Sequence, residues 1–270
     1  MSLVNFIHVT DLHLSHPEAN DENLNINTER MLLKFIEIIS LLKFQPDFLV
    51  ISGDLANHGA LRSYKFLKEC LSAFSWPVIM ALGNHDNREN FYHVFNNQSS
   101  SSPYYHDNLY AGLHVITLDT SVPGLVSGKI CSEQFGYLDH VLEKNENIPK
   151  LLVLHHPPQI DTDGLSWSSL DIESTRKLQT ALKGKKIIGI LAGHIHINRF
   201  SLWDGIPVCI SNGLHSYIDI LETNHLRILN GSSFSICTLR PSGLSVSYVP
   251  LTPKQNELGI VDQERLKEFT

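Results

Sequence analysis

The feature that most constrains this chain is a series of short apolar segments, each ending in residues able to bind a metal. Segment 76–82 is apolar and is followed directly by Gly83-Asn84-His85-Asp86. Four other apolar segments also end in carboxylate or imidazole side chains. A buried strand that stops in a turn explains each apolar run. The repeated polar ending therefore indicates that similar chemistry is gathered at the ends of several strands.

Strands and helices are expected to alternate over the first 200 residues. Apolar runs predict strands at 3–10, 46–52, 76–82, 113–119, 150–154 and 187–192. Helices are expected from about residue 28, at 61–74, from Asp86, from Ser132, which would cap its helix, and at 170–182. The strand–helix–strand repeat is typical of a parallel sheet. Ligands of such sheets bind at the carboxyl ends of the strands, where Asp11, His13, Asp54 and Asn84 lie.

The chain changes character after His196, where short β-rich runs alternate with turns. Trp203-Asp204-Gly205-Ile206 carries a two-residue hairpin signal, and segments 234–239 and 244–251 predict a second hairpin. We therefore expect a single domain over residues 1–270. It comprises a motif-bearing α/β part at 1–200, a β-rich part at 201–252 that completes the second sheet, and a polar tail at 253–270.

Composition limits the partners and the compartment. Apolar residues make up 42% of the 270 residues, which is enough to bury a substantial core. The formal net charge of −7 argues against a nucleic-acid partner. Four scattered cysteines without a C-x-x-C pair indicate reduced thiols. Without a leader segment, or an apolar stretch of the about 20 residues that a bilayer needs, we expect a cytoplasmic protein with no membrane contact.

The polar endings together offer only oxygen and imidazole nitrogen to a metal. Such a set suits Mn, Fe, Co or Zn and lacks the thiolates of a structural zinc site. Seven ligands are too many for one ion and suit two ions that share a carboxylate. The candidate ligands are Asp11, His13, Asp54, Asn84, His155, His194 and His196.

The order D-x-H, G-D, G-N-H-D, H-H-P-P and G-H-x-H resembles the calcineurin-like metallophosphoesterase family. It looks most like the class III cyclic-nucleotide phosphodiesterases and the related bacterial glycerophosphodiesterases. The resemblance implies a four-layer α/β sandwich, in which helices flank two mixed β-sheets and a dinuclear metal site lies at the strand ends. It also implies that Asp54 bridges the two ions. The other ligands would be Asp11, His13 and His196 for the first ion, and Asn84, His155 and His194 for the second.

The resemblance further implies a metal-dependent phosphodiesterase, with 3′,5′-cyclic nucleotides as the first expected substrates. Two ions about 3.5–4 Å apart would support an in-line displacement at phosphorus, with a metal-bridging hydroxide as the nucleophile. His85 would act as general acid, because the pKa of imidazole lies near neutrality.

Several alternatives share this pattern of motifs. The chain could instead be a glycerophosphodiesterase, a nucleotide-pyrophosphate hydrolase, a phosphomonoesterase or a nuclease of the same family. A non-enzymatic scaffold is opposed by the complete ligand set, and a nuclease by the acidic charge. Related enzymes are often dimers, which by analogy makes a homodimer an option.

Two residues beside the ligand Asn84 are candidates for the catalytic machinery. The resemblance makes His85 a group that faces the substrate, and Asn84 would also lie close to the bound phosphate. Asp86 either forms a capping box with Glu89 or orients His85, in which case it supports catalysis.

Other polar residues are candidates for contact with the substrate. His156 follows a ligand directly, so it should support the ligands or line the substrate site. Asn57 and His58 lie in a loop that contacts substrate in the related phosphodiesterases. His215 and Tyr217 follow a late apolar run and could line the same pocket.

Overall fold

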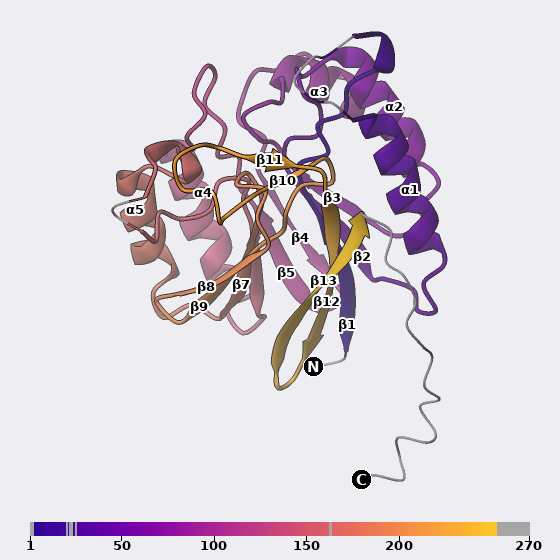
Figure 1. Ribbon diagram of the computed structural model, residues 1–270. Coiled ribbons are helices and arrows are strands. Elements are labelled where there is room, and N and C mark those ends of the chain that lie inside the picture. The colour runs from indigo at the N-terminus through magenta and orange to yellow at the C-terminus, as the bar shows by residue number, and fades with distance from the viewer. Residues whose placement is uncertain (1–2, 20, 22–23, 25, 162–163, 253–270) are drawn as a thin grey trace.

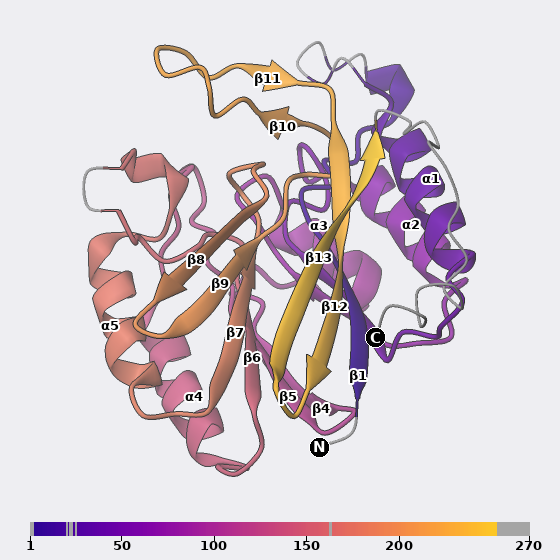
Figure 2. The ribbon, with the colours of Figure 1, turned by 60° about the horizontal axis from the view of Figure 1, so that its bottom comes forward.

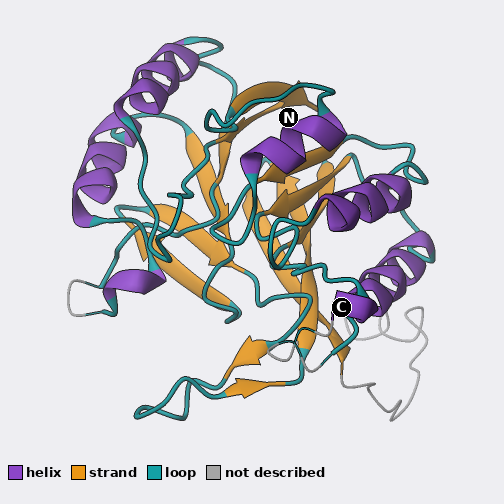
Figure 3. Ribbon diagram, turned by 90° about the horizontal axis from the view of Figure 1, so that it is seen from above, coloured by secondary structure: helices purple, strands orange, loops and turns teal. Residues whose placement is uncertain are grey.

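Two mixed β-sheets lie face to face between two sets of helices in the computed structural model of the chain (Figure 1, Figure 3). The structure describes residues 3–19, 21, 24, 26–161 and 164–252. The predicted four-layer α/β sandwich is therefore confirmed. Within the described residues, no helix is long and apolar enough to cross a membrane.

The first sheet has the strand order β13-β12-β1-β2-β3. Strands β1, β2 and β3 run parallel to one another, whereas β12 runs antiparallel to both of its neighbours. The strands are β1 Val4–Val9, β2 Phe48–Ser52, β3 Val78–Ala81, β12 Ser232–Arg240 and β13 Gly243–Thr252.

The second sheet has the strand order β4-β5-β6-β7-β9-β8, with the two edge strands antiparallel to the rest. Its strands are β4 His106–Tyr110, β5 Leu113–Thr117, β6 Lys150–Val153, β7 Ile187–Ala192, β8 Arg199–Trp203 and β9 Ile206–Ile210. A further pair, β10 Tyr217–Ile218 and β11 Ile228–Leu229, forms an arm beyond the sheets (Figure 2).

The helices cover the outer faces of the two sheets (Figure 1). Those packed on the first sheet are α1 Thr28–Ser40, α2 Leu61–Leu71 and α3 Arg88–Phe95. Those packed on the second sheet are α4 Ser132–Glu143 and α5 Ile172–Leu182. Two short 3₁₀ helices, Pro17–Ala19 and Ser166–Ser168, interrupt loops. The helix predicted from about residue 28 is present as α1, and its apolar stripe of Met31, Leu32, Phe35 and Ile39 is buried against the first sheet.

Three apolar layers hold the four structural layers together. In β1, Val4 and Phe6 belong to the layer between the two sheets, while Ile7 and Val9 face the helices. Phe6 stacks on Phe48 in that middle layer, with ring centroids 4.7 Å apart. A strand buried on both faces has no polar side to show, which explains why these strands appear in the sequence as continuous apolar runs.

The division of strands between the sheets corrects one prediction. Residues 201–252 were expected to complete the second sheet, but only β8 and β9 do so, whereas β12 and β13 extend the first. Edge strand β4 was not predicted, because His106–Tyr110 carries no apolar run. Both predicted hairpins are present, and the turn at Asp204 and Gly205 has φ of 49° and 79°. The predicted tail, 253–270, lies outside the described residues.

Two predicted helix starts are also corrected. The N-cap of α3 is Asn87, whose side chain accepts a hydrogen bond from the Asn90 amide, so the predicted capping box at Asp86 is wrong. Helix α4 begins at Ser132 with Cys131 as its N-cap residue, and Ser132 itself does not cap.

Candidate metal centre

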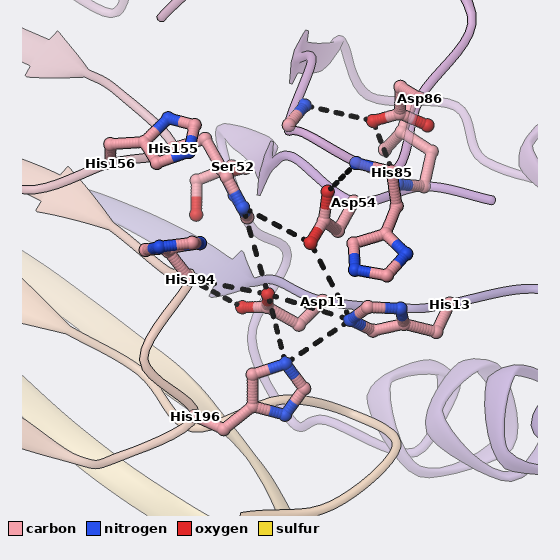
Figure 4. Close-up of polar contacts among 12 residues, drawn as sticks. Asp11, His13, Ser52, Asp54, His85, Asp86, His155, His156, His194 and His196 are labelled. Carbon is pink, nitrogen blue, oxygen red and sulfur yellow. Dashed lines mark hydrogen bonds and ion pairs between the residues drawn. The ribbon is translucent and has the colours of Figure 1, made fainter. Parts of the chain in front are cut away.

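The carboxyl ends of β1, β2, β3, β6 and β7 bring the predicted ligands to one place between the two sheets. Figure 4 shows imidazole rings from both sheets surrounding two carboxylates, those of Asp11 and Asp54. Both carboxylates are at most 2% exposed. The sequence thus predicted a cluster that the fold assembles from segments far apart in the chain.

Asp11 and Asp54 occupy the middle of the cluster. The Asp11 carboxylate lies 3.3 Å from His196 Nε2 and 3.8 Å from His13 Nε2. The Asp54 carboxylate lies 3.2 Å from His155 Nε2 and 3.6 Å from His13 Nε2. Asp54 therefore lies between imidazoles that the sequence assigned to different ions, and it lies closer to His155 than Asp11 does (3.2 against 4.0 Å), as a bridging ligand would.

Four candidate ligand histidines each use one ring nitrogen to bond a protein oxygen, which leaves the other nitrogen for the centre. Such bonds fix the ring orientation and the tautomer of metal-binding histidines. The pairs are His13 Nδ1 with the Asn57 side chain (2.9 Å), His155 Nδ1 with the Ser52 carbonyl (2.9 Å), His196 Nδ1 with the Ser216 carbonyl (3.1 Å) and His194 Nε2 with the Trp167 carbonyl (2.7 Å). Three of the four acceptors are main-chain carbonyls. No sequence signal could have identified them, because every residue carries one.

The backbone at the cluster adopts the left-handed region at an unusual number of positions. Among the described residues, nine non-glycine residues have positive φ, and five of these are candidate ligands. Each such residue costs about 1–3 kcal/mol and persists only where surrounding contacts enforce it. The five are Asp11 (52°), His13 (43°), Asp54 (51°), His194 (73°) and His196 (49°).

Two motif glycines leave room for the ligands. A Cβ on Gly83 would overlap Asp54 Oδ1, and one on Gly193 would overlap the Thr10 hydroxyl and lie 2.5 Å from Asp11 Oδ2. Real Cβ atoms do not approach so closely, so a larger residue at Gly83 would displace Asp54, and one at Gly193 would displace Thr10 or Asp11. The glycines of the G-N-H-D and G-H-x-H motifs are therefore explained by close approach to the ligands.

The charges of the cluster compensate one another. Burial raises the pKa of the Asp11 carboxyl, but His196 and His13 outweigh it and hold this pKa well below its usual range. Burial lowers the pKa of His155, but the adjacent Asp54 carboxylate reverses the effect and raises it to about 9. Burial and the neighbouring His155 lower the pKa of His194 to about 4, so its ring is neutral near pH 7. The two buried carboxylates are therefore stabilised by positive charge placed next to them.

The contacts within the cluster fit bound metal. His13 Nε2 and His196 Nε2 face each other at 3.2 Å, although each ring already donates through Nδ1. If both rings were neutral, the lone pairs of the two Nε2 atoms would face and repel each other. A proton or a metal cation between the two nitrogens would remove this repulsion. Within the described structure, Asn84 Oδ1 is also buried without a hydrogen-bond partner, and the one close contact of His155 Nε2 is the Asp54 carboxylate at 3.2 Å. Amide oxygen and imidazole nitrogen are suitable ligands for a borderline divalent ion.

His85 lies beside the cluster and is exposed to solvent. Its backbone amide donates to Asp54 Oδ1 at 2.9 Å, and its Nδ1 donates to the Asn57 carbonyl at 2.8 Å. Its ring meets the edge of the His13 ring, with centroids 4.6 Å apart. Nε2 is therefore the ring nitrogen available to a substrate.

Asn57 has a role other than the predicted contact with substrate. It is only 6% exposed, and it accepts hydrogen bonds from His13 through its side chain and from His85 through its carbonyl. It therefore positions a candidate ligand and the candidate acid together. His58 has an exposed ring that lies 2.8 Å from a carboxylate oxygen of Asp21, and its contact with substrate stays a prediction.

Asp86 joins two loops of the centre. Its carboxylate accepts hydrogen bonds from main-chain amides at Gly83, Leu55 and Ala56 and from the Tyr64 hydroxyl. Asp86 therefore fixes the loop after β3 against the loop after β2. The ring of His85 is bonded by Asn57 instead, so the predicted orientation of His85 by Asp86 is indirect at most.

Of the two roles predicted for His156, the structure favours support of the ligands over contact with substrate. This ring is fully buried, and both of its nitrogens are engaged. Nδ1 bonds the Thr120 hydroxyl at 2.7 Å, and Nε2 donates to the Val126 carbonyl at 3.0 Å. Its ring packs 4.3 Å from that of His194, so it supports a ligand.

His215 lies closer to the centre than its sequence context indicated. Its ring centroid is 5.2 Å from that of His13, and one of its nitrogens can meet the same ion as His13 and His196. The other late candidate, Tyr217, begins strand β10 and packs against Gly231 at the base of the arm.

Comparison with known proteins shows which family the chain matches. A profile of the calcineurin-like phosphoesterase family matches residues 4–198. A probable cyclic nucleotide phosphodiesterase of Rhodococcus erythropolis is 31% identical over 76% of this chain and 69% of its own length. A cAMP/cGMP dual specificity phosphodiesterase of Mycobacterium tuberculosis is 29% identical over 76% of this chain and 66% of its own length. A probable glycerophosphodiester phosphodiesterase of Arcobacter nitrofigilis is 28% identical over 75% of each chain.

Solved structures share the fold. A dimetal phosphatase from Danio rerio has a TM-score of 0.66 at 13% identity, over 92% of this chain and 96% of that one. A purple acid phosphatase from yellow lupin has a TM-score of 0.64 at 13% identity, over 94% of this chain and 52% of that one. At such identity the likeness concerns the fold alone.

The central place of Asp54 predicts unequal metal loss in two variants. We expect Asp54→Ala to lose most of the metal bound by the wild type, because the carboxylate would serve both ions. Asn84→Ala should lose only about one ion. Elemental analysis after dialysis against Mn²⁺ measures both, with the exposed His93→Ala as control. Equal metal content in the first two variants would contradict the bridging assignment.

Proposed function

Since this chain belongs to the calcineurin-like phosphoesterase family, we propose that it hydrolyses 3′,5′-cyclic nucleotides. The family and the phosphodiesterase names of its relatives identify a hydrolase of phosphodiesters. The step from phosphodiester to cyclic nucleotide is the proposal. It is supported by the relatives named for that activity, at 29–31% identity over about three quarters of this chain.

The observation that supports phosphodiester hydrolysis is the exposed residue His85, whose Nδ1 alone is bonded, beside a buried cluster of candidate metal ligands; the names of the relatives support the step to cyclic nucleotides. A cyclic phosphodiester has an alkoxide leaving group, which needs a proton as the bond to phosphorus breaks. A donor next to a metal centre supplies what this reaction requires.

Two metal ions are proposed to occupy the cluster. Asp11, His13 and His196 would hold one ion, Asn84, His155 and His194 the other, and Asp54 both. When bound, divalent ions of this kind supply Lewis-acid stabilisation of the phosphoryl charge and make water more acidic at the site. The protein orients these ligands through Ser52, Asn57, Trp167 and Ser216.

His85 is proposed to be the general acid. The hydrogen bond to the Asn57 carbonyl keeps a proton on Nδ1, so the proton on Nε2 of the imidazolium is the one delivered to the leaving oxygen. The bond from the His85 amide to Asp54 fixes the backbone of the acid relative to the centre. Hydrogen bonds to Asn57 and Asp54 thus set the position of the acid relative to the metals.

A glycerophosphodiesterase is the second candidate. It is favoured by the Arcobacter nitrofigilis relative, which is 28% identical over 75% of each chain. The same ligands and the same acid would serve this reaction, because both substrates are diesters with an alkoxide leaving group.

A substrate panel tests the proposal. We expect the Mn²⁺-loaded protein to hydrolyse cyclic AMP or cyclic GMP with a higher kcat/KM than glycerophosphoethanolamine. Bis(p-nitrophenyl) phosphate should likewise be a better substrate than p-nitrophenyl phosphate. Preference for glycerophosphoethanolamine would move the assignment to the second candidate. Preference for the monoester would contradict both.

The role of His85 predicts a loss that depends on the leaving group. General acids typically contribute about 10²–10⁴-fold, so His85→Ala should lower kcat/KM for a cyclic nucleotide by roughly this factor. The loss on bis(p-nitrophenyl) phosphate should be much smaller, because p-nitrophenolate leaves without a proton. Steady-state kinetics on both substrates measure the difference.

Metal content is the control for this variant, because His85 is not among the proposed ligands. His93→Ala, in an exposed position of α3, should behave as the wild type. Equal losses on both substrates at full metal content would mean that His85 binds phosphate without donating a proton.

A further inference from the structure

A cavity of about 770 Å³ lies beside the metal centre. It is lined by residues within 157–161 and 164–169, by the segment that leads into β8, by β8 itself, and by the arm that carries β10 and β11. Its volume falls within the range of about 300–1,000 Å³ that is usual for sites of small ligands.

The cavity adjoins the centre through residues next to the ligands. Ile195 lines it and stands between His194 and His196 in the chain. Trp167 also lines it, while its carbonyl accepts the 2.7 Å hydrogen bond from His194 Nε2 and its ring meets that of His194 at 5.9 Å. Trp167 therefore belongs both to the lining of the cavity and to the immediate surroundings of the candidate ligand His194.

Apolar side chains gather around this cavity although they are open to solvent. Leu165 is 64% exposed, Ile220 65%, Leu226 56% and Ile160 41%, and all four line it. Exposed apolar side chains gathered around one hollow mark a surface that binds something. Deeper in the cavity, Ile195 and Ile210 are buried.

The polar lining selects against an anion. Asp161, Asp219 and Glu222 line the cavity, whereas Arg199 is the only lysine or arginine among its lining residues in the described part of the chain. Arg227 pairs with Asp219 at 3.2 Å, so the lining keeps a small surplus of negative charge, which disfavours a pyrophosphate or a fatty-acid carboxylate. A neutral ligand is not disfavoured.

Two carboxamides complete the lining. Gln159 and Asn224 both face the cavity, and within the described residues neither side-chain amide has a hydrogen-bond partner. A carboxamide presents a donor and an acceptor side by side, which matches the edge of a purine such as adenine.

We propose that this cavity binds the nucleobase of the substrate, as a neutral, flat group held between apolar walls and recognised by carboxamides. This inference rests on the proposed cyclic-nucleotide function and favours it over the second candidate. Glycerol is small and polar and makes no use of exposed leucine and isoleucine side chains. Trp167 offers an aromatic face of the kind on which bases stack.

A matched pair of variants on the arm tests the cavity. Leu226→Asp places a charge at the rim, while Leu221→Asp places the same charge on a residue that is 86% exposed and does not line the cavity. We expect Leu226→Asp to raise KM for cyclic AMP about 5-fold or more, in the range of single base contacts, with little change in kcat. Leu221→Asp should match the wild type.

Adenosine supplies a readout that does not depend on catalysis. Calorimetric titration of the Mn²⁺-loaded protein should give adenosine binding that Leu226→Asp weakens by a similar factor. Ser201→Phe, which fills the cavity from β8, should weaken it further, with Ser245→Phe on the exposed side of β13 as its control. Kinetics on glycerophosphoethanolamine should be unchanged in all four variants.

The outcomes separate this inference from the proposed function. If the wild type hydrolyses cyclic AMP but Leu226→Asp and Ser201→Phe bind adenosine as well as their controls, the base does not occupy the cavity. Equal losses on cyclic AMP and glycerophosphoethanolamine would also overturn the inference, because the variants would then act through the metal centre. If the wild type hydrolyses no cyclic nucleotide, the proposed function fails, whatever the variants do.

Discussion

Two carboxylates buried side by side, those of Asp11 and Asp54, set the condition on which the rest of this structure depends. Burying negative charge is costly unless positive charge lies close by. Imidazoles from both sheets supply contacts of 3.2–4.0 Å to these oxygens, and left-handed backbone at five ligands brings the side chains into place. The fold thus concentrates backbone strain, close glycine contacts and unsatisfied ligand atoms in one region. These features fit a centre completed by metal.

The clustering of the candidate ligands and the layers could be predicted from sequence because both leave local signals. Ligand residues follow apolar runs directly, and a strand buried on both faces is apolar throughout. The distribution of strands between two sheets could not be predicted, since a strand–helix–strand repeat looks the same whether its strands share one sheet or not. The contacts that hold the candidate ligands and their loops in place could not be predicted either. Asp86 accepts from main-chain amides of the preceding loop, and Trp167 acts through its carbonyl, so neither role depends on a recognisable pair of side chains.

The candidate metal ligands and the loops around them are suited to different parts of the reaction. Ligands at strand ends suit any phosphoester, and the charge of a phosphate is the same whichever alcohol it carries. We therefore propose that discrimination among alcohols depends on loops beyond the strands, in particular residues 157–161 and 164–169 and the arm around β10 and β11. This division fits a family in which relatives named for cyclic nucleotides and for glycerophosphodiesters match the same chain at similar identity.

The central claim is that the buried cluster holds two metal ions joined by Asp54. Anomalous diffraction at the manganese absorption edge, from crystals of the protein loaded with Mn²⁺, tests it most directly. The account predicts two anomalous peaks, one among Asp11, His13 and His196 and the other among Asn84, His155 and His194, with the Asp54 carboxylate in contact with both. A single peak at full loading, or two peaks of which Asp54 contacts only one, would contradict it.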